Sequence, residues 1–232
     1  MKLTLPFRQF MAETYGTFVI LFSSVLAYAV LATVEPFTAL IVSSVVYGLT
    51  YAAMHYTLGH ISGGHFNPML TVAAYDDGRI TSKQGMIYVA AQVAAALVAG
   101  IMVLWITQSL QVPFAVLGYA SLSPLRTNLW IALVIELFVS YFITYVFLAV
   151  SQRKVSYLTG ISVGFMMMSV MMTTGLLTGG HANPARVFAT LIFAGSTGRS
   201  QLALYIIAPF VGSLLARWFY KYFKYSDKQD VA

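Results

Sequence analysis

Six apolar stretches divide the chain, and each holds twenty or more residues with at most two charges. A helix needs about 20 apolar residues to cross the roughly 30 Å hydrocarbon core of a bilayer. Only 9% of the residues are charged, against about 25% in soluble domains, so water cannot be the main solvent. We therefore predict an all-α membrane protein with six transmembrane helices. These helices are expected near Phe10–Val34, Phe37–Leu58, Gln84–Thr107, Leu129–Val150, Val155–Leu177 and Leu202–Phe223.

A polar hexapeptide occurs twice in this apolar chain. The two copies read Gly63-Gly64-His65-Phe66-Asn67-Pro68 and Gly179-Gly180-His181-Ala182-Asn183-Pro184. Each copy leads into a short apolar piece, Asn67–Tyr75 or Asn183–Ala194. Neither piece is long enough to span a membrane alone. The recurrence predicts a duplicated protein whose halves each bring one Asn-Pro to a shared site.

The two halves are expected to be inverted repeats. Three predicted spans fall in each half, and an odd number of spans reverses the orientation of the second half. Glu13 is followed by Thr17, and Glu136 is followed by Ser140 at the same offset. We predict one channel domain over residues 1–232. Repeat 1 would cover about 8–107, repeat 2 about 129–224, and a polar C-terminal tail 226–232.

Basic residues predict the orientation in the membrane. Six spans place both termini on one side, and ten of the thirteen Lys and Arg residues fall on that side. The other side holds Arg126, Arg186 and Arg199. Cytoplasmic segments carry the excess of Lys and Arg, so both termini are expected in the cytoplasm. The protein would be a multi-pass protein of the cell membrane, plasma or inner.

Small residues recur at helical spacing in three spans. Gly160 and Gly164 form one such pair, Gly212 and Ala216 another. Small side chains let helix backbones approach closely in lipid. The spacing does not decide whether these contacts lie within one subunit or between subunits.

Each Asn-Pro is expected to open a short helix. Asn is a preferred N-cap, and Pro at the first helical position loses no hydrogen bond. The preceding glycines allow a tight, non-helical path, which is tolerated at membrane depth only in protein or beside a wet cavity. Four backbone carbonyls of this path are candidates to face a file of water. They belong to Gly64, His65, Gly180 and His181.

The two short helices would meet near the midplane from opposite faces. Each helix N-terminus carries about half a positive charge, so together they would repel cations. The side-chain amides of Asn67 and Asn183 would project there as donors. A water molecule held by both donors would point its own protons away and interrupt a proton wire.

The chain resembles the aquaporin or major intrinsic protein family over nearly its whole length. The resemblance rests on Ala12-Glu13 with Gly16-Thr17-Phe18, on Gly59-His60-Ile61-Ser62-Gly63-Gly64-His65-Phe66-Asn67-Pro68, and on Asn183-Pro184-Ala185-Arg186. It implies six helices with two half-helices, a narrow pore in each subunit and a homotetramer. Asn67 and Asn183 match the central asparagines of the family, and Pro68, Met69, Pro184 and Ala185 complete the two motifs.

The resemblance also implies a selectivity filter. Arg186 matches the arginine of the outer constriction, and the other constriction positions are Tyr47, Met171 and Gly180. Met69 departs from the family because it stands where Ala is usual. Met171 replaces the His of strict water channels, and His181 stands where a small polar residue is more common. The filter matches neither the strict water type nor the glycerol type.

Two sets of polar residues have competing interpretations. Carboxylates within spans are functional suspects, and a proton-coupled transporter would need one. For Glu13 and Glu136 the resemblance implies instead a structural role, in which they accept hydrogen bonds from the backbone of the folded-in loops, and their symmetric placement fits this role. His65 and His181 are interpreted as residues that hold the loops. The sequence leaves open a histidine that senses pH, and no histidine spacing resembles a metal site.

We therefore predict a passive channel for water that also admits small neutral solutes and excludes ions and protons. A glycerol or small-solute facilitator is the first alternative, and a secondary transporter with broken helices is the second. A membrane-packing protein with a closed pore is the third, and Met69 is its only support. No catalytic constellation is present, so an enzyme is not expected. The expected partners are water, neutral solutes, the lipid bilayer and identical subunits, without nucleic acid, cofactor or metal.

Overall fold

The protein, seen in a computed structural model that describes residues 4–114, 127–152 and 156–229, is a bundle of helices. Six helices in these ranges are long and apolar enough to cross a membrane, as predicted. The long helices are α1 (Leu5–Leu31), α2 (Pro36–Ser62), α4 (Ser82–Ser109), α5 (Leu129–Val150), α6 (Thr159–Thr178) and α9 (Leu202–Gln229). The short helices are α3 (Pro68–Asp76), η2 (Ser156–Leu158), α7 (Pro184–Thr190), η3 (Leu191–Phe193) and α8 (Gly195–Ser200).

The helix boundaries follow local signals in the sequence. Glu35 caps α2, because its carboxylate accepts from the backbone N–H groups of Phe37 and Thr38, and Pro36 takes the first helical position. Hydrogen bonds from Thr38 and then Phe37 lower the pKa of this exposed carboxyl, since they stabilise its charged form. The helix α9 continues to Gln229, so the predicted tail is helical over residues 226–229.

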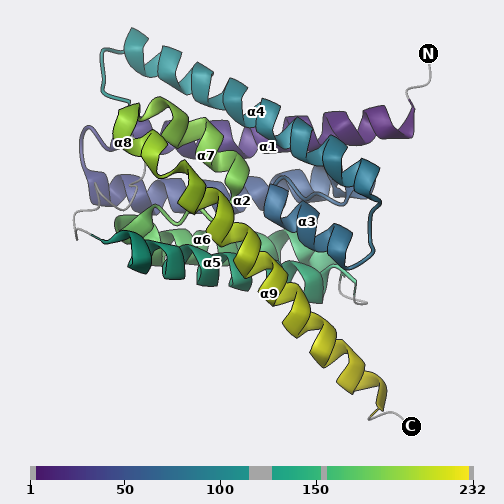
Figure 1. Ribbon diagram of the computed structural model, residues 1–232. Coiled ribbons are helices and arrows are strands. Elements are labelled where there is room, and N and C mark those ends of the chain that lie inside the picture. The colour runs from purple at the N-terminus through teal and green to yellow at the C-terminus, as the bar shows by residue number, and fades with distance from the viewer. Residues whose placement is uncertain (1–3, 115–126, 153–155, 230–232) are drawn as a thin grey trace.

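The two short helices α3 and α7 lie inside the bundle (Figure 1). The start of α1 and the end of α9 lie at the same end of the molecule, as an even number of spans requires. Four basic residues used in the orientation argument lie outside the described residues, so the structure does not place them. They are Lys2, Arg126, Arg153 and Lys154.

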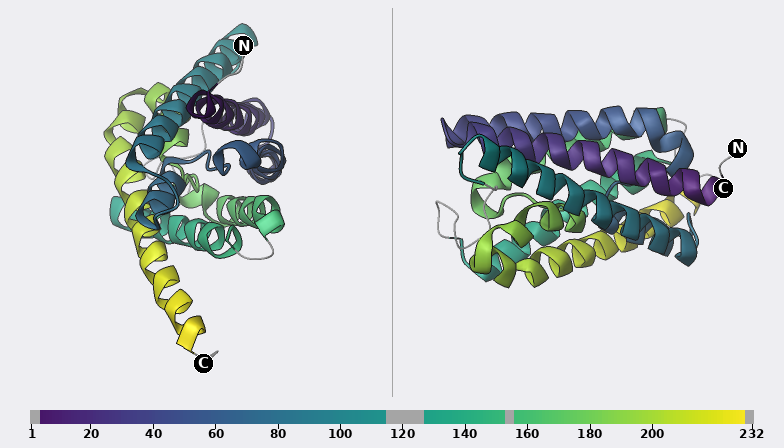
Figure 2. Two further views of the ribbon diagram at one scale, coloured as in Figure 1. Left: turned by 90° about the vertical axis from the view of Figure 1, so that its right-hand side faces the viewer. Right: turned by 90° about the horizontal axis from the view of Figure 1, so that it is seen from above.

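Each short helix packs against the last long helix of the other half. The helix α7 packs on α4, and α3 packs on α9 (Figures 1 and 2). At the first contact, a Cβ on Gly100 would lie 3.0 Å from the Cα of Ala189. At the second contact, the hydroxyl of Ser213 donates to the backbone carbonyl of Met69 over 2.9 Å. The two halves are therefore interlocked rather than placed side by side.

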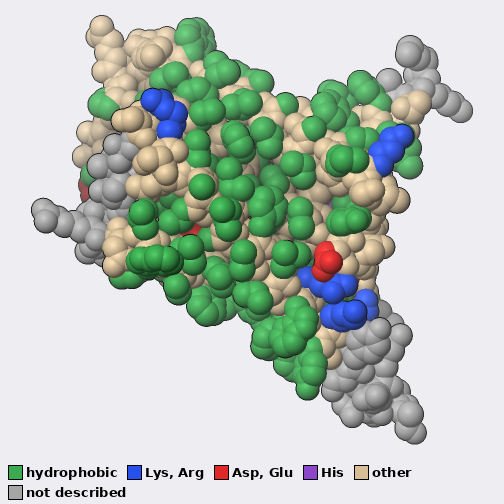
Figure 3. Space-filling model, in the orientation of Figure 1, with side chains coloured by type: hydrophobic (Ala, Val, Ile, Leu, Met, Phe, Trp, Pro, Cys, Tyr) green, Lys and Arg blue, Asp and Glu red, His purple; other side chains and the backbone are tan. Residues whose placement is uncertain are grey.

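The outer surface is suited to lipid. Hydrophobic side chains cover the middle of the face seen in Figure 3, and Lys and Arg lie toward its two ends. Large exposed apolar residues occur on every long helix, among them Trp105, Trp130 and Trp218. Such a surface would be an aggregation hazard in water, so it agrees with a membrane location.

Glycines bring the long helices into backbone contact within one subunit. Gly48 of α2 and Gly164 of α6 face each other, and a Cβ on either would collide with the carbonyl of the other. Gly212 of α9 packs in the same way on the carbonyl of Leu137 in α5. Two of the predicted small-residue motifs therefore serve contacts inside the subunit.

Replacing Gly212 with Leu is expected to lower the free energy of unfolding by about 1–3 kcal/mol, the usual cost of overpacking. The new side chain has no room against the Leu137 carbonyl. Thermal unfolding in detergent measures the loss. Val211→Leu is the matched control because Val211 is its neighbour and is 41% exposed. Equal melting temperatures for the two variants would contradict this account of the α5–α9 contact.

Candidate functional site

The first folded-in loop is held by the buried carboxylate of Glu13. This side chain accepts from the hydroxyl of Ser62 at 2.6 Å and the side-chain amide of Gln92 at 2.8 Å. It also accepts from the backbone N–H groups of His65 at 3.0 Å and Phe66 at 2.7 Å. One carboxylate thus serves four donors that the irregular backbone and its neighbours would otherwise leave unpaired at membrane depth.

Glu136 holds the second loop in the same way with fewer donors. It accepts from the hydroxyl of Thr178 at 2.7 Å and from the N–H groups of His181 at 3.1 Å and Ala182 at 2.9 Å. Ser62 and Thr178 each lie five residues before the Asn of their motif, so the repeat itself carries this hydroxyl position. The predicted loop-supporting geometry of the two acids is therefore present.

The two loops share an unusual backbone. Gly63 and Gly179 end α2 and α6 in the left-handed region, both with φ of 90°. Phe66 and Ala182 also have positive φ, at 50° and 41°, which is uncommon for residues with a side chain. Their N–H groups are fixed on the glutamates, and the turned backbone directs their carbonyls toward the opposite loop. The strain therefore lies where the two loops meet.

Both asparagines cap the short helices as predicted. The Oδ1 atom of Asn67 accepts from the N–H of Met69 at 3.0 Å, and that of Asn183 accepts from Ala185 at 2.9 Å. Pro68 and Pro184 take the first helical positions. The two helix N-termini therefore begin at the asparagines.

The side-chain amides cross between the loops. Asn67 Nδ2 donates to the carbonyl of Ala182 at 2.9 Å, and Asn183 Nδ2 donates to the carbonyl of Phe66 at 3.2 Å. The sequence predicted that both amides are donors facing a shared space, but it did not predict that each amide donates to the loop of the other half. Each amide has two N–H bonds, so one bond to a carbonyl leaves a second for another acceptor. For Asn183 that acceptor is the hydroxyl of Tyr47, at 3.4 Å.

The four predicted filter residues come together. The guanidinium of Arg186 lies 5.1 Å from the ring centre of Tyr47 and donates over 3.3 Å to the carbonyls of Gly179 and Gly180. A Cβ on Gly180 would lie 2.9 Å from the Cα of Met171. Tyr47, Met171 and Arg186 are all at most 1% exposed. The absence of a side chain at Gly180 therefore serves close packing on α6, a reason that the sequence did not suggest.

Two of the four carbonyls predicted to face water have side-chain donors. The Gly64 carbonyl accepts from the Tyr51 hydroxyl at 3.0 Å and contacts His55 Nδ1 at 3.3 Å. The Gly180 carbonyl accepts from Arg186. The sequence does not show which side chains can reach the loops. A carbonyl oxygen has two lone pairs, so for all four carbonyls the expectation that they face water stays a prediction.

The two loop histidines are packed among aromatic rings. His65 lies edge-on to Tyr88 and Phe147, and its Nδ1 is 3.2 Å from the hydroxyl of Thr71. His181 lies edge-on to Tyr205, with 4.6 Å between ring centres. These contacts agree with the interpretation of both residues as loop-holding groups.

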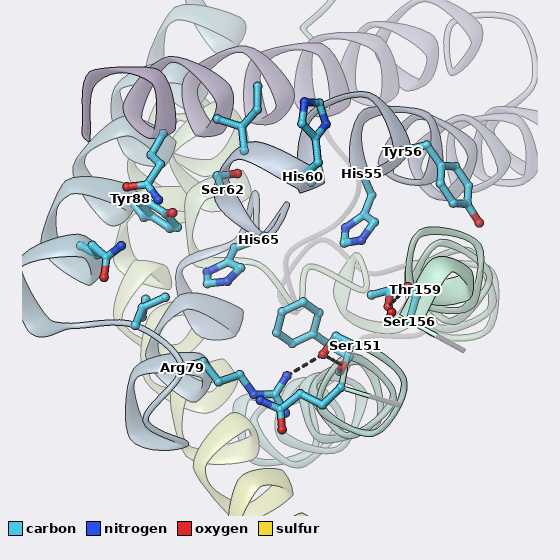
Figure 4. Close-up of a pocket in the computed structure, with 18 of the residues that line it drawn as sticks. His55, Tyr56, His60, Ser62, His65, Arg79, Tyr88, Ser151, Ser156 and Thr159 are labelled. Atoms are coloured by element: carbon cyan, nitrogen blue, oxygen red, sulfur yellow. Dashed lines mark hydrogen bonds between the residues drawn. The ribbon is translucent and has the colours of Figure 1, made fainter. Parts of the chain in front are cut away.

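A cavity of about 680 Å³ opens at the end of the bundle where α1 begins (Figure 4). Its wall includes residues from α2, α4, α5 and the first loop, and among them is His65, two residues before Asn67. Arg79 on this wall is fixed by Asp77, by the Ser151 hydroxyl and by the Leu148 carbonyl. The cavity therefore borders the first folded-in loop, which ends at Asn67.

Each folded-in loop is held by a glutamate, and the asparagines of the two loops face each other. Comparison with known proteins identifies the family of this chain. A family model described as major intrinsic protein matches residues 2–220. The chain belongs to the major intrinsic protein family. Members of this family are passive channels for water or small solutes and not enzymes. The sequence-based expectation about fold and protein class is thereby confirmed.

Relatives in this family include plant and bacterial proteins. Aquaporin NIP1-2 of Arabidopsis thaliana is 30% identical, over 98% of this chain and 78% of the relative. Glycerol uptake facilitator protein-like 6 of Lactiplantibacillus plantarum is 31% identical, over 90% of this chain and 94% of the relative. The solved aquaglyceroporin of Plasmodium falciparum has the same fold, with a TM-score of 0.80 and 22% identity over 93% of this chain and 95% of that chain.

Replacing Glu13 with Gln is expected to destabilise this family fold. The amide oxygen accepts fewer bonds than a carboxylate, and each buried donor left unpaired costs about 1–3 kcal/mol. Thermal unfolding and osmotic water flux are the measurements. Glu35→Gln is the matched control, because that carboxylate is exposed at the start of α2. If Glu13→Gln melts no earlier than Glu35→Gln, the loop does not depend on the buried charge.

Proposed function

We propose that this chain forms a passive pore for water and small neutral solutes that excludes ions and protons. The observation that carries the proposal is the pair of asparagine side chains, each of which donates to the loop of the other half. Two helix N-termini begin there, and their partial positive charges oppose the passage of cations. The second N–H bond of Asn67 is the donor offered to water, since that of Asn183 lies 3.4 Å from the Tyr47 hydroxyl.

Arg186 supports the exclusion of cations at the outer constriction. Its guanidinium is buried against Tyr47 and fixed by the carbonyls of Gly179 and Gly180, so it cannot swing away without losing these contacts. An arginine stays charged and presents several donors in one plane. A neutral solute that exchanges hydrogen bonds with these donors can pass where a cation meets repulsion.

The glycerol and small-solute facilitator is the second candidate. It is favoured by the apolar Met171 in the filter and by the likeness to a bacterial protein named as a glycerol uptake facilitator. The secondary transporter is less well supported, because the packing of α3 on α9 and of α7 on α4 ties the two halves together. Alternating access would require the halves to move against each other.

The assembly and orientation are part of the proposal. We expect one pore in the single channel domain of each chain, four chains in the assembly, and both termini in the cytoplasm of a plasma or inner membrane. The cavity near the start of α1 would then be the cytoplasmic mouth of the pore.

Proteoliposomes that contain the protein are expected to swell faster in response to an osmotic gradient than empty liposomes. The activation energy should be close to that of water diffusion, because a pore needs no conformational cycle. Stopped-flow light scattering at several temperatures gives both quantities. Swelling at the empty-liposome rate, or saturable flux with a steep temperature dependence, would contradict the proposal.

Replacing Arg186 with Val is expected to raise cation leak while water flux continues. The leak should increase about tenfold or more, since a barrier lower by only ~1.4 kcal/mol has that effect. A fluorescent pH indicator inside the liposomes reports proton entry under an imposed potential. Arg199→Val is the control, because Arg199 is exposed on α8 and has no place in the filter. Equal leak in both variants would remove Arg186 from the barrier.

A further inference from the structure

His55 occupies a position at the cytoplasmic mouth that mirrors a filter position at the other end. It lies twelve residues before Asn67, and Met171 lies twelve residues before Asn183. Gly64 and Gly180 correspond in the same way, three residues before each Asn. Because the two loops share their backbone conformation, the inverted repeat places His55 beside Gly64 much as it places Met171 beside Gly180.

Three glycines form a cradle around the His55 side chain. A Cβ on Gly64 would lie 2.5 Å from His55 Nδ1, and one on Gly59 would lie 3.3 Å from Nε2. A Cβ on Gly160 would lie 3.2 Å from His55 Cβ. The ring also stacks on Tyr51, with 5.8 Å between centres. The imidazole is therefore held in one place by surfaces from α2, α6 and the first loop.

The hydrogen bond to Gly64 determines which nitrogen of the His55 ring can accept a hydrogen bond from a solute in the cavity. A carbonyl only accepts, so the contact of 3.3 Å between the Gly64 oxygen and Nδ1 requires a proton on Nδ1. In a neutral imidazole the other nitrogen, Nε2, is then an acceptor. Nε2 has no hydrogen-bond partner among the described residues and is not one of the fully buried polar atoms, and His55 lines the cavity.

The mouth suits a neutral solute with hydroxyl groups. Among the described residues that line it, there is no carboxylate, and Arg79 is already bound to Asp77 and Ser151. The rings of His55 and His65 flank the hollow in Figure 4. Its volume of about 680 Å³ exceeds that of a water molecule, about 30 Å³, many times over. A small polyol can therefore enter and donate a hydroxyl to His55 before it reaches the asparagines.

We propose that His55 is a second specificity-determining residue, which accepts a hydrogen bond from a small polyol at the cytoplasmic mouth. This inference rests on the proposed pore and names a solute class for it. The channel would then select solutes at two sites, the filter that contains Arg186 and the mouth that contains His55. These two sites lie on opposite sides of the asparagines.

The test compares glycerol and water permeability in proteoliposomes by stopped-flow light scattering. His55→Phe keeps the size of the ring and removes both nitrogens, while Tyr51 still holds the Gly64 carbonyl. We expect glycerol permeability to fall about fivefold, the loss that one neutral hydrogen bond represents, with a change in water permeability below about twofold.

His60→Phe is the matched control, because this exposed histidine lines the same cavity outside the glycine cradle. The inference is overturned if His55→Phe leaves the ratio of glycerol to water unchanged, or if His60→Phe shifts it equally. It is also overturned if the unmodified protein conducts water but no glycerol, a result that leaves the proposed pore intact. A protein that conducts neither would refute the proposed function itself.

Discussion

The structure depends on two buried carboxylates. A chain that leaves helical geometry inside a membrane exposes N–H groups that neither lipid nor neighbouring backbone can satisfy. Glu13 and Glu136 remove this problem by accepting from two consecutive N–H groups of each loop and from the hydroxyl five residues before each Asn. Without these acceptors, the positive φ of Phe66 and Ala182 would have no compensation, and their carbonyls would not face the opposite half.

The two anchors are not equivalent. Glu13 gains a fourth donor from Gln92, whose amide also donates to the hydroxyl of Thr71 at 3.0 Å. That hydroxyl in turn donates to the carbonyl of Asn67 at 3.2 Å, so the first loop, α3 and α4 share one network. The second loop relies instead on Arg186, which donates to Gly179 and Gly180. The residue that we propose repels cations thus also shapes the backbone around it.

Much of the fold could be predicted from the sequence because membranes impose simple rules. Apolar length gave the six spans, and the repeated Asn-Pro gave α3 and α7 together with their N-caps. The family resemblance implies that the two acids support the loops, and the spacing that repeats between the halves agrees with this role. These features depend on local chemistry or on the internal repeat, and both can be read from the amino-acid sequence alone.

The remaining features depend on which side chains meet in space. The side-chain amides of Asn67 and Asn183 each donate to a backbone carbonyl more than a hundred residues away in the sequence. Tyr51 and His55 reach the Gly64 carbonyl from an earlier part of α2, and no motif marks them. The twelve-residue offset from Asn67 was the one signal for His55, since it equals the offset of Met171 from Asn183.

Tyr47 connects two parts of the pore that are usually considered separately. Its ring lies under Arg186, and its hydroxyl is 3.4 Å from the Asn183 amide. One side chain from the first half therefore touches both the charge at the constriction and the donor at the centre. A replacement at position 47 would alter the surroundings of Arg186 and of the Asn183 amide at once. Evolutionary change in solute preference at this position is therefore constrained by the need to keep the Asn183 amide oriented. Natural variation at this position should therefore be accompanied by compensating change around Asn183, and a designer who retunes this pore must treat the three residues as one unit.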